Sequence, residues 1–128
     1  MVRAQSILKI VDNSGGKKAK CLKVKGKSGL SHANLGDVVV VSIQSVKPRY
    51  KSQVRVRVNR SEVHRGVVVQ TRRFYRQSDG KRLSFGSNSV VLINSKGKSI
   101  GTRISTFLPR YLRHLKWSKI GVLARGLI

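Results

Sequence analysis

Few side chains in this 128-residue chain could carry out catalysis, because it has four acidic residues, three histidines and one cysteine. Metal-assisted cleavage of a phosphodiester requires clustered carboxylates. Here the carboxylates are spread over separate turns and strand ends, at Asp12, Asp37, Glu62 and Asp79. One cysteine and three scattered histidines do not form a zinc site, and nothing in the sequence places the thiol beside a base. We therefore expect no catalytic residue, no metal ion and no cofactor.

Two of these residues have ordinary structural explanations. Cys21 lies in a stretch of alternating apolar and basic residues, which predicts a buried thiol in a β-strand rather than a reactive one. His64 stands two residues from Glu62, and a hydrated surface histidine explains this spacing better than an acid–base pair. The function of the chain therefore rests on its basic residues.

Those basic residues are abundant, with 28 lysines and arginines and a formal net charge of +24. Beyond Asp79 there is no carboxylate, yet ten more basic residues follow between Lys81 and Arg125. A compact domain with this charge repels itself unless a polyanion binds to it, and the closely spaced phosphates of a nucleic acid match it best. No apolar run approaches the ~20 residues of a membrane span, and the first residues lack the pattern of a signal or transit peptide. We expect neither a membrane nor a small-molecule substrate as partner.

Most of the charge falls in three clusters that we predict to contact phosphates, because the guanidinium of arginine and the ammonium of lysine bind phosphate oxygens. The first cluster is Lys17, Lys18, Lys20, Lys23, Lys25 and Lys27; the second is Arg49, Lys51, Arg55, Arg57, Arg60 and Arg65; the third is Arg72, Arg73, Arg76, Lys81 and Arg82. Further candidates are Lys96, Lys98 and Arg103. A merely solvated basic face is the alternative, and the scarcity of acidic partners disfavours it.

The elements that must position these clusters are mostly short strands. Patterns typical of strands, either rich in β-branched residues or alternating between apolar and polar residues, occur at residues 6–11, 19–26, 38–43, 66–71, 82–85 and 89–94. We expect Leu22 and Val24 to be buried after a slip in the alternation, and the valines of residues 38–41 to be buried on both faces of their strand. Turn-forming residues separate the strands. This pattern predicts a mainly β, single-domain small barrel over residues 1–128.

Two segments extend this barrel. Residues 47–60 alternate valine with arginine, which predicts a basic hairpin or loop extension. Residues 105–128 are predicted to form a loop and two short helices, because Pro109 suits a helix start. Apolar residues also recur there at helical spacing, at Trp117, Ile120 and Leu123 or Ala124. We expect Trp117 to pack its helix on the barrel or on a neighbouring protein.

Three aromatic residues stand among the arginines: Tyr50, Phe74 and Tyr75. They could stack on nucleic-acid bases or close the ends of the barrel. The second role is favoured for Phe74, and both remain open for Tyr50 and Tyr75.

Five groups of residues occur in a specific order along the chain. They are Val11-Asp12-Asn13-Ser14-Gly15-Gly16 with Cys21-Leu22-Lys23-Val24; Gly36-Asp37-Val38 with Pro48-Arg49; Gly66-Val67-Val68-Val69; Asp79-Gly80 with Phe85, Asn88 and Val91-Leu92; and Ile100-Gly101-Thr102-Arg103-Ile104. Each group alone is a weak signal. In this order and spacing the chain resembles, over nearly its whole length, the family of large-subunit ribosomal protein fourteen, of the bacterial and organellar type.

The resemblance implies a five-stranded β-barrel with two short C-terminal helices and a structural role in the large ribosomal subunit. It implies binding to large-subunit rRNA, contact with neighbouring large-subunit proteins, and an intersubunit bridge to small-subunit rRNA. In the family a ribosome-silencing factor docks on the C-terminal helical region. The basic residues expected at the bridge or factor contact are here Arg110, Arg113, Lys116 and Lys119.

The chain also departs from the bacterial pattern. Pro109 stands where bacterial members often carry threonine, close to the docking region. Residues 50–57 are longer and more basic than the bacterial pattern, and the total charge is higher. Both features favour a mitochondrial ribosome, with plastid and bacterial ribosomes as alternatives. The alternative function is a free-standing small-barrel nucleic-acid-binding protein, but such a protein would present more exposed aromatic side chains.

Overall fold

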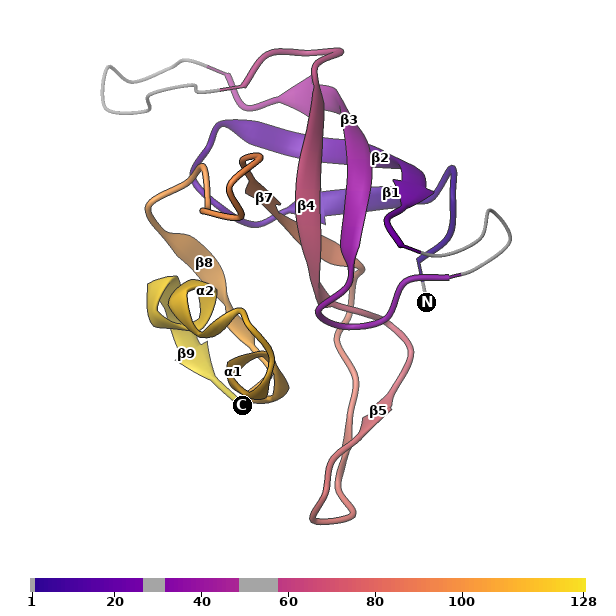
Figure 1. Ribbon diagram of the computed structural model, residues 1–128, viewed down its shortest axis with the longest axis vertical. Helices are drawn as coiled ribbons and strands as arrows, with labels where there is room; N and C mark the ends of the chain where they lie inside the picture. Colours follow the sequence, from indigo (N-terminus) through magenta and orange to yellow (C-terminus); the bar gives the residue numbers. More distant parts are fainter. Residues whose placement is uncertain (1, 27–31, 49–57) are drawn as a thin grey trace.

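The computed structural model describes residues 2–26, 32–48 and 58–128, and five strands among them close into a β-barrel (Figure 1). In barrel order they are β1 (Ile7–Ile10), β2 (Gly16–Val24), β3 (Val38–Val46), β4 (Val63–Gln70) and β7 (Ser89–Ile93). Neighbouring strands are antiparallel except at the closure, where β1 pairs with β7 in parallel. The mainly β class and the five-stranded barrel are confirmed.

Alternate residues of these strands fill the barrel, and Leu8, Ala19 and Val41 among them are fully buried. This alternation follows because successive side chains of a strand point to opposite faces. Cys21 belongs to the same interior cluster, so the predicted buried thiol is confirmed. Burial raises the pKa of the Cys21 thiol, and the contact of its Sγ with the Lys23 carbonyl offsets this in part.

A C-terminal unit covers one outer face of the barrel. It consists of β8 (Ile104–Leu108), α1 (Tyr111–His114), α2 (Ser118–Leu123) and β9 (Ala124–Leu127), and β8 pairs with β9 in parallel. Side chains of this unit form a second apolar cluster with the outward residues of β4 and β7. The barrel strands contribute Val67, Val69, Val91 and Ile93, and the unit contributes Leu108, Leu112, Trp117 and Ile120. Every residue of β7 is therefore buried.

Gly36 allows this unit to approach the barrel closely. Its φ is +85°, and a Cβ atom at this position would overlap the side chain of Leu115. The Gly36 N–H donates to the Val68 carbonyl at 2.8 Å, and the Gly36 carbonyl accepts from Nε1 of Trp117 at 2.8 Å. The indole is 6% exposed. The expectation that Trp117 packs its helix on the barrel is confirmed.

A turn at Asp12 and Asn13 ties three distant segments together. The buried Asp12 carboxylate accepts from the Ser14 N–H and hydroxyl and from the Leu92 N–H of β7. The Asn13 side-chain oxygen accepts from the backbone N–H groups of Thr102 (2.7 Å) and Arg103 (3.1 Å). These two residues therefore have a structural role, because they connect this turn to β7 and to the segment that precedes β8.

A two-stranded hairpin projects from the barrel between β4 and β7, as Figure 1 shows. It contains β5 (Tyr75–Arg76) and β6 (Arg82–Leu83), joined by a turn at Gly80 with a φ of +87°. The predicted strand at residues 82–85 is thus shorter than expected. The hairpin gives the third basic cluster a platform outside the barrel.

Several sequence-based predictions are wrong in detail. Leu22 is 41% exposed, because a bulge between Cys21 and Lys23 turns two successive residues outward. Val38 and Val40 are half-buried; the strands buried on both faces are β4 beyond Arg65 and β7, which the C-terminal unit covers. Residues 104–108 and 124–127 form strands in place of the predicted loop and helix end.

The two short C-terminal helices are confirmed as α1 and α2. Most of the predicted extension at 47–60 lies outside the described residues, so its hairpin stays a prediction. At its base, Val58 is fully buried in the barrel core.

Candidate nucleic-acid interface

The first basic cluster lies along β2 and just beyond it. Lys17, Lys18, Lys23 and Lys25 are exposed and Lys20 is half-buried, whereas Lys27 lies outside the described residues. Their strand alternates them with Ala19, Cys21 and Val24, which point into the core. Alternation therefore turns Lys18 and Lys20 outward, and register shifts next to Lys18 and between Cys21 and Lys23 turn Lys17 and Lys23 outward as well. The lysines of β2 therefore form one cationic surface on the outside of the barrel.

Two pairs of basic residues lie directly opposite each other on neighbouring strands. Lys9 of β1 is the cross-strand partner of Lys18, and Arg76 of β5 is the partner of Arg82. Like charges in this position destabilise a sheet, and all four side chains are exposed. An anion between the members of each pair would relieve their repulsion. Lys9 was not among the residues predicted from sequence, although its place between Leu8 and Ile10 shows that it points outward.

The third cluster occupies the projecting hairpin. Arg72, Arg73, Arg76, Lys81 and Arg82 are all exposed there. Arg72 is held in place by two contacts: its Nε donates to the Gly86 carbonyl at 3.1 Å, and its backbone N–H donates to Asn88 Oδ1 at 3.0 Å. Lys81 Nζ lies 3.9 Å from Asp79 Oδ2 at the exposed tip. The hairpin therefore carries several cations with little neutralising charge.

The second cluster is described only in part. Arg60 and Arg65 are exposed, and Arg65 lies on β4. Arg49, Lys51, Arg55 and Arg57, like Tyr50, lie outside the described residues. Their contact with nucleic acid stays a prediction.

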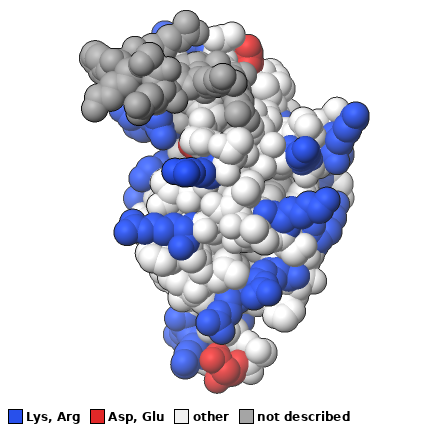
Figure 2. All heavy atoms as spheres, turned by 90° about the vertical axis from the view of Figure 1, so that its left-hand side faces the viewer, with Lys and Arg blue, Asp and Glu red and all other residues white. Residues whose placement is uncertain are grey.

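The remaining candidates lie around the C-terminal unit. Lys96, Lys98 and Arg103 are exposed on the connection between β7 and β8, and Arg110, Arg113, Lys116 and Lys119 are exposed on or beside α1 and α2. Figure 2 shows lysine and arginine side chains over the whole length of one face of the molecule, with only small areas of acidic side chains. Sequence reasoning missed Lys47 and Arg125, whose exposure becomes evident only in the fold.

The structure contradicts the prediction for one of the aromatic residues, Phe74. Phe74 is 56% exposed on the hairpin, so the prediction that it closes the barrel end is wrong; the Arg82 guanidinium lies over its ring, 4.9 Å from the centroid. The Tyr75 ring lies 4.8 Å from that of Tyr111 and joins the hairpin to the C-terminal unit. Desolvation, and to a smaller extent Tyr111, raises the pKa of the Tyr75 hydroxyl.

The potentially catalytic residues do not gather in one site, although His64 is a half-buried partner of Glu62 and not the hydrated surface residue that was predicted. His64 Nε2 lies 2.8 Å from Glu62 Oε2, and this hydrogen bond is the main cause of a lowered Glu62 pKa. Cys21 is in the barrel core two strands from His64, because its cross-strand partner Val41 is in turn paired with His64. In the part of the chain that is described, no group of three or more His, Cys, Asp or Glu residues could hold a metal ion. Across residues 2–26, 32–48 and 58–128, no helix has the length and apolar character to cross a membrane.

A closed barrel with a cationic outer surface, a basic hairpin and an attached C-terminal unit can bind a large polyanion at several points. The family model for ribosomal protein L14p/L23e matches residues 1–128, the whole chain. The chain belongs to the ribosomal protein L14p/L23e family. Members are structural components of the large ribosomal subunit rather than enzymes. Membership in the L14p/L23e family therefore makes this chain a structural constituent of that subunit and implies its rRNA and proteins as partners.

Proposed function

We propose that this chain binds large-subunit rRNA through its β2 surface and projecting hairpin, and that residues 47–60 add to this contact. The observation that carries the proposal is the presence of two like-charged cross-strand pairs, Lys9 with Lys18 and Arg76 with Arg82. Such pairs cost stability in the free protein and become favourable when phosphates lie between them. Double-helical RNA is recognised mainly through its phosphates, its 2′-hydroxyls and its shape, which suits a surface of long cationic side chains.

Arg76→Gln separates a role in RNA binding from a role in folding. The free variant should be as stable as the original protein or slightly more stable, because one like-charge contact is removed. Its affinity for large-subunit rRNA should fall, and the slope of log K against log salt should become shallower by about one counterion. The measurements are urea unfolding and filter binding over a salt series. An unchanged slope together with unchanged affinity would contradict the assignment of Arg76.

We further propose that the C-terminal unit faces the subunit interface, where it contacts small-subunit rRNA and can receive a protein such as a ribosome-silencing factor. Exposed Arg110, Arg113, Lys116 and Lys119 surround this unit, and Val122 of α2 is 83% exposed among them. Pro109 is buried, so the residue that differs from the bacterial threonine does not itself lie on this exposed surface. Lys119→Glu should weaken joining of the subunits or binding of the factor, measured by sedimentation, while leaving the protein in its own subunit.

We also propose a mitochondrial ribosome as the compartment, with plastid and bacterial ribosomes as the alternatives. The formal charge of +24 and the basic segment at residues 47–60 support this proposal. Mass spectrometry of ribosomes purified from each compartment tests it. A stable component should remain with the large subunit through a high-salt gradient, whereas a free-standing nucleic-acid-binding protein should dissociate.

A further inference from the structure

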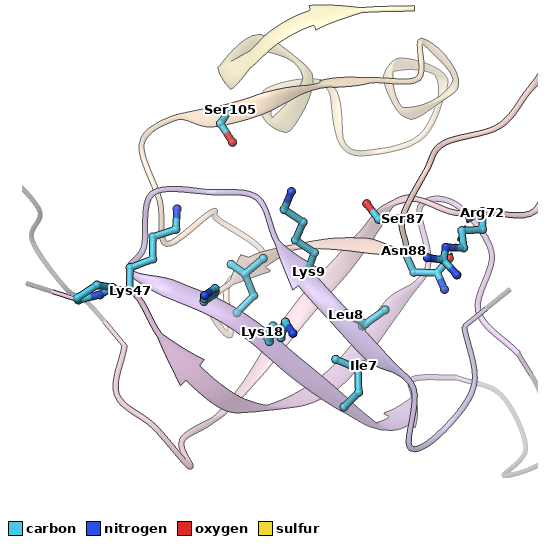
Figure 3. Close-up of a pocket in the computed structure, with 12 residues that line it drawn as sticks. Ile7, Leu8, Lys9, Lys18, Lys47, Arg72, Ser87, Asn88 and Ser105 are labelled. Carbon is cyan, nitrogen blue, oxygen red and sulfur yellow. Dashed lines mark hydrogen bonds between the residues drawn. The ribbon is translucent and has the colours of Figure 1, made fainter.

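A groove of about 650 Å³ runs over the outer surface of β1 (Figure 3). Lys9 projects from β1 toward the strand that carries Ser105, with Lys47 at one end of the groove and Arg72 beside Asn88 at the other. Among the described residues, five cations and no carboxylate line this groove. Its size falls within the range of pockets that hold a small organic ligand, about 300–1,000 Å³.

The groove also has an apolar part that phosphate binding does not require. Ile7 points outward from β1, is 54% exposed, and stands beside Lys20 on the neighbouring strand. Pro48, a second exposed apolar residue of the lining, follows Lys47 and lies toward the other end of the groove. Apolar surface of this kind costs free energy when it is left in water. A ligand that carries a flat or apolar group as well as negative charge would match both parts of the groove.

One end of the groove is rigid and polar. The Asn88 side-chain oxygen accepts from the Arg72 N–H, and the Asn88 carbonyl accepts from the Lys9 N–H at 3.0 Å. With its oxygen engaged in this way, the Asn88 amide has its NH2 group available as a donor. The Arg72 side chain is fixed in turn by its bond to Gly86. These groups can donate to a carbonyl oxygen of a base or to a phosphate without reorganising.

We propose that this groove binds a single unstacked nucleotide of the RNA, with its base on Ile7, its edge at Asn88 and its flanking phosphates on Lys9, Lys18 and Arg72. This inference rests on the proposed RNA binding and adds a base-binding subsite to it. Proteins read RNA most specifically at bases that leave the helix. A peptide fits less well, because β1 is paired with β2 and β7 and offers no free strand edge for backbone hydrogen bonds.

The test uses the intact chain and two short RNA hairpins, identical except that one carries a bulged uridine. The original protein should bind the bulged hairpin about tenfold more tightly, the preference that one base contact supplies. Ile7→Asn should abolish this preference, and Leu22→Asn, an exposed apolar residue of β2 outside the groove, should preserve it. Lys9→Gln should weaken both hairpins alike. A bulged 4-thiouridine should crosslink to the peptide containing Ile7 or Asn88.

The outcomes separate the two proposals. Equal affinity of the original protein for both hairpins overturns the base-binding subsite and leaves RNA binding intact. Failure to bind either hairpin at low salt overturns RNA binding as well. Carboxylate–lysine crosslinks in assembled large subunits that join Lys9 and Lys18 to an acidic segment of another protein would show a protein in the groove and overturn the subsite.

Discussion

Replacing Asp12 with alanine tests the claim that this carboxylate is a structural centre. The side chain is 2% exposed and accepts from the Leu92 N–H (3.1 Å), the Ser14 N–H (3.2 Å) and the Ser14 hydroxyl. Alanine leaves the buried Leu92 and Ser14 donors without an acceptor. Each buried donor without a partner costs about 1–3 kcal/mol. The three losses share one site and do not simply add, so we expect the free energy of unfolding to fall by about 2–4 kcal/mol.

Urea unfolding followed by Trp117 fluorescence measures this loss, because the indole is buried in the native fold. With a slope of about 2 kcal/mol per molar urea, typical of a small protein, the midpoint should fall by about 1–2 M. Asp79→Ala is the matched control: Asp79 also accepts a backbone N–H, from Lys81, but it is exposed. That variant should stay within about 0.5 kcal/mol of the original protein. If both variants unfold at the same urea concentration, the buried acceptor is not what stabilises this turn.

Two further predictions concern packing and pH. Gly36→Ala should destabilise the protein by about 2 kcal/mol more than Gly97→Ala, because both glycines have positive φ but only Gly36 has a side chain, Leu115, where the new Cβ would go; equal urea midpoints would refute the close approach. The hydrogen bond from His64 lowers the pKa of Glu62. The stability that this bond contributes is therefore present above the pKa of Glu62 in the unfolded chain, and it is lost as the pH falls through the pKa of Glu62 in the folded protein. His64→Ala should raise the Glu62 pKa measured by carboxyl NMR titration, and an unchanged titration would exclude this cause.

Much of the fold follows from local patterns that the sequence shows directly. The alternation around Ala19 and Cys21 fixes which residues of this part of β2 face the core, and therefore that Lys18 and Lys20 face outward. The valine-rich runs at residues 66–71 and 89–94 predict β4 and β7. The hairpin turn at Gly80 is visible as a turn-forming pair with Asp79. These features depend on residues that are close in the chain, so periodicity and turn chemistry are sufficient to find them.

Other features depend on contacts between distant segments and could not be found in this way. The bulge that exposes Leu22 arises from pairing with β3, and β9 forms because β8 offers it a parallel partner. The like-charge pairs exist only because strand register places Lys9 opposite Lys18 and Arg76 opposite Arg82. The groove over β1 collects residues from several elements that are distant in the sequence.

By itself, the sequence determined that the chain is strongly cationic, mainly β and similar to one ribosomal family, because composition, alternation and ordered motifs are properties of the chain alone. The tertiary structure decided what those motifs do. Asp12 and Asn13 bind the backbone of Leu92, Thr102 and Arg103, so a motif with polar, potentially reactive side chains serves to join the barrel to the segment that precedes β8. The tertiary structure also decided where the charge is concentrated, because strand register, rather than sequence spacing, sets the distance between cations on neighbouring strands.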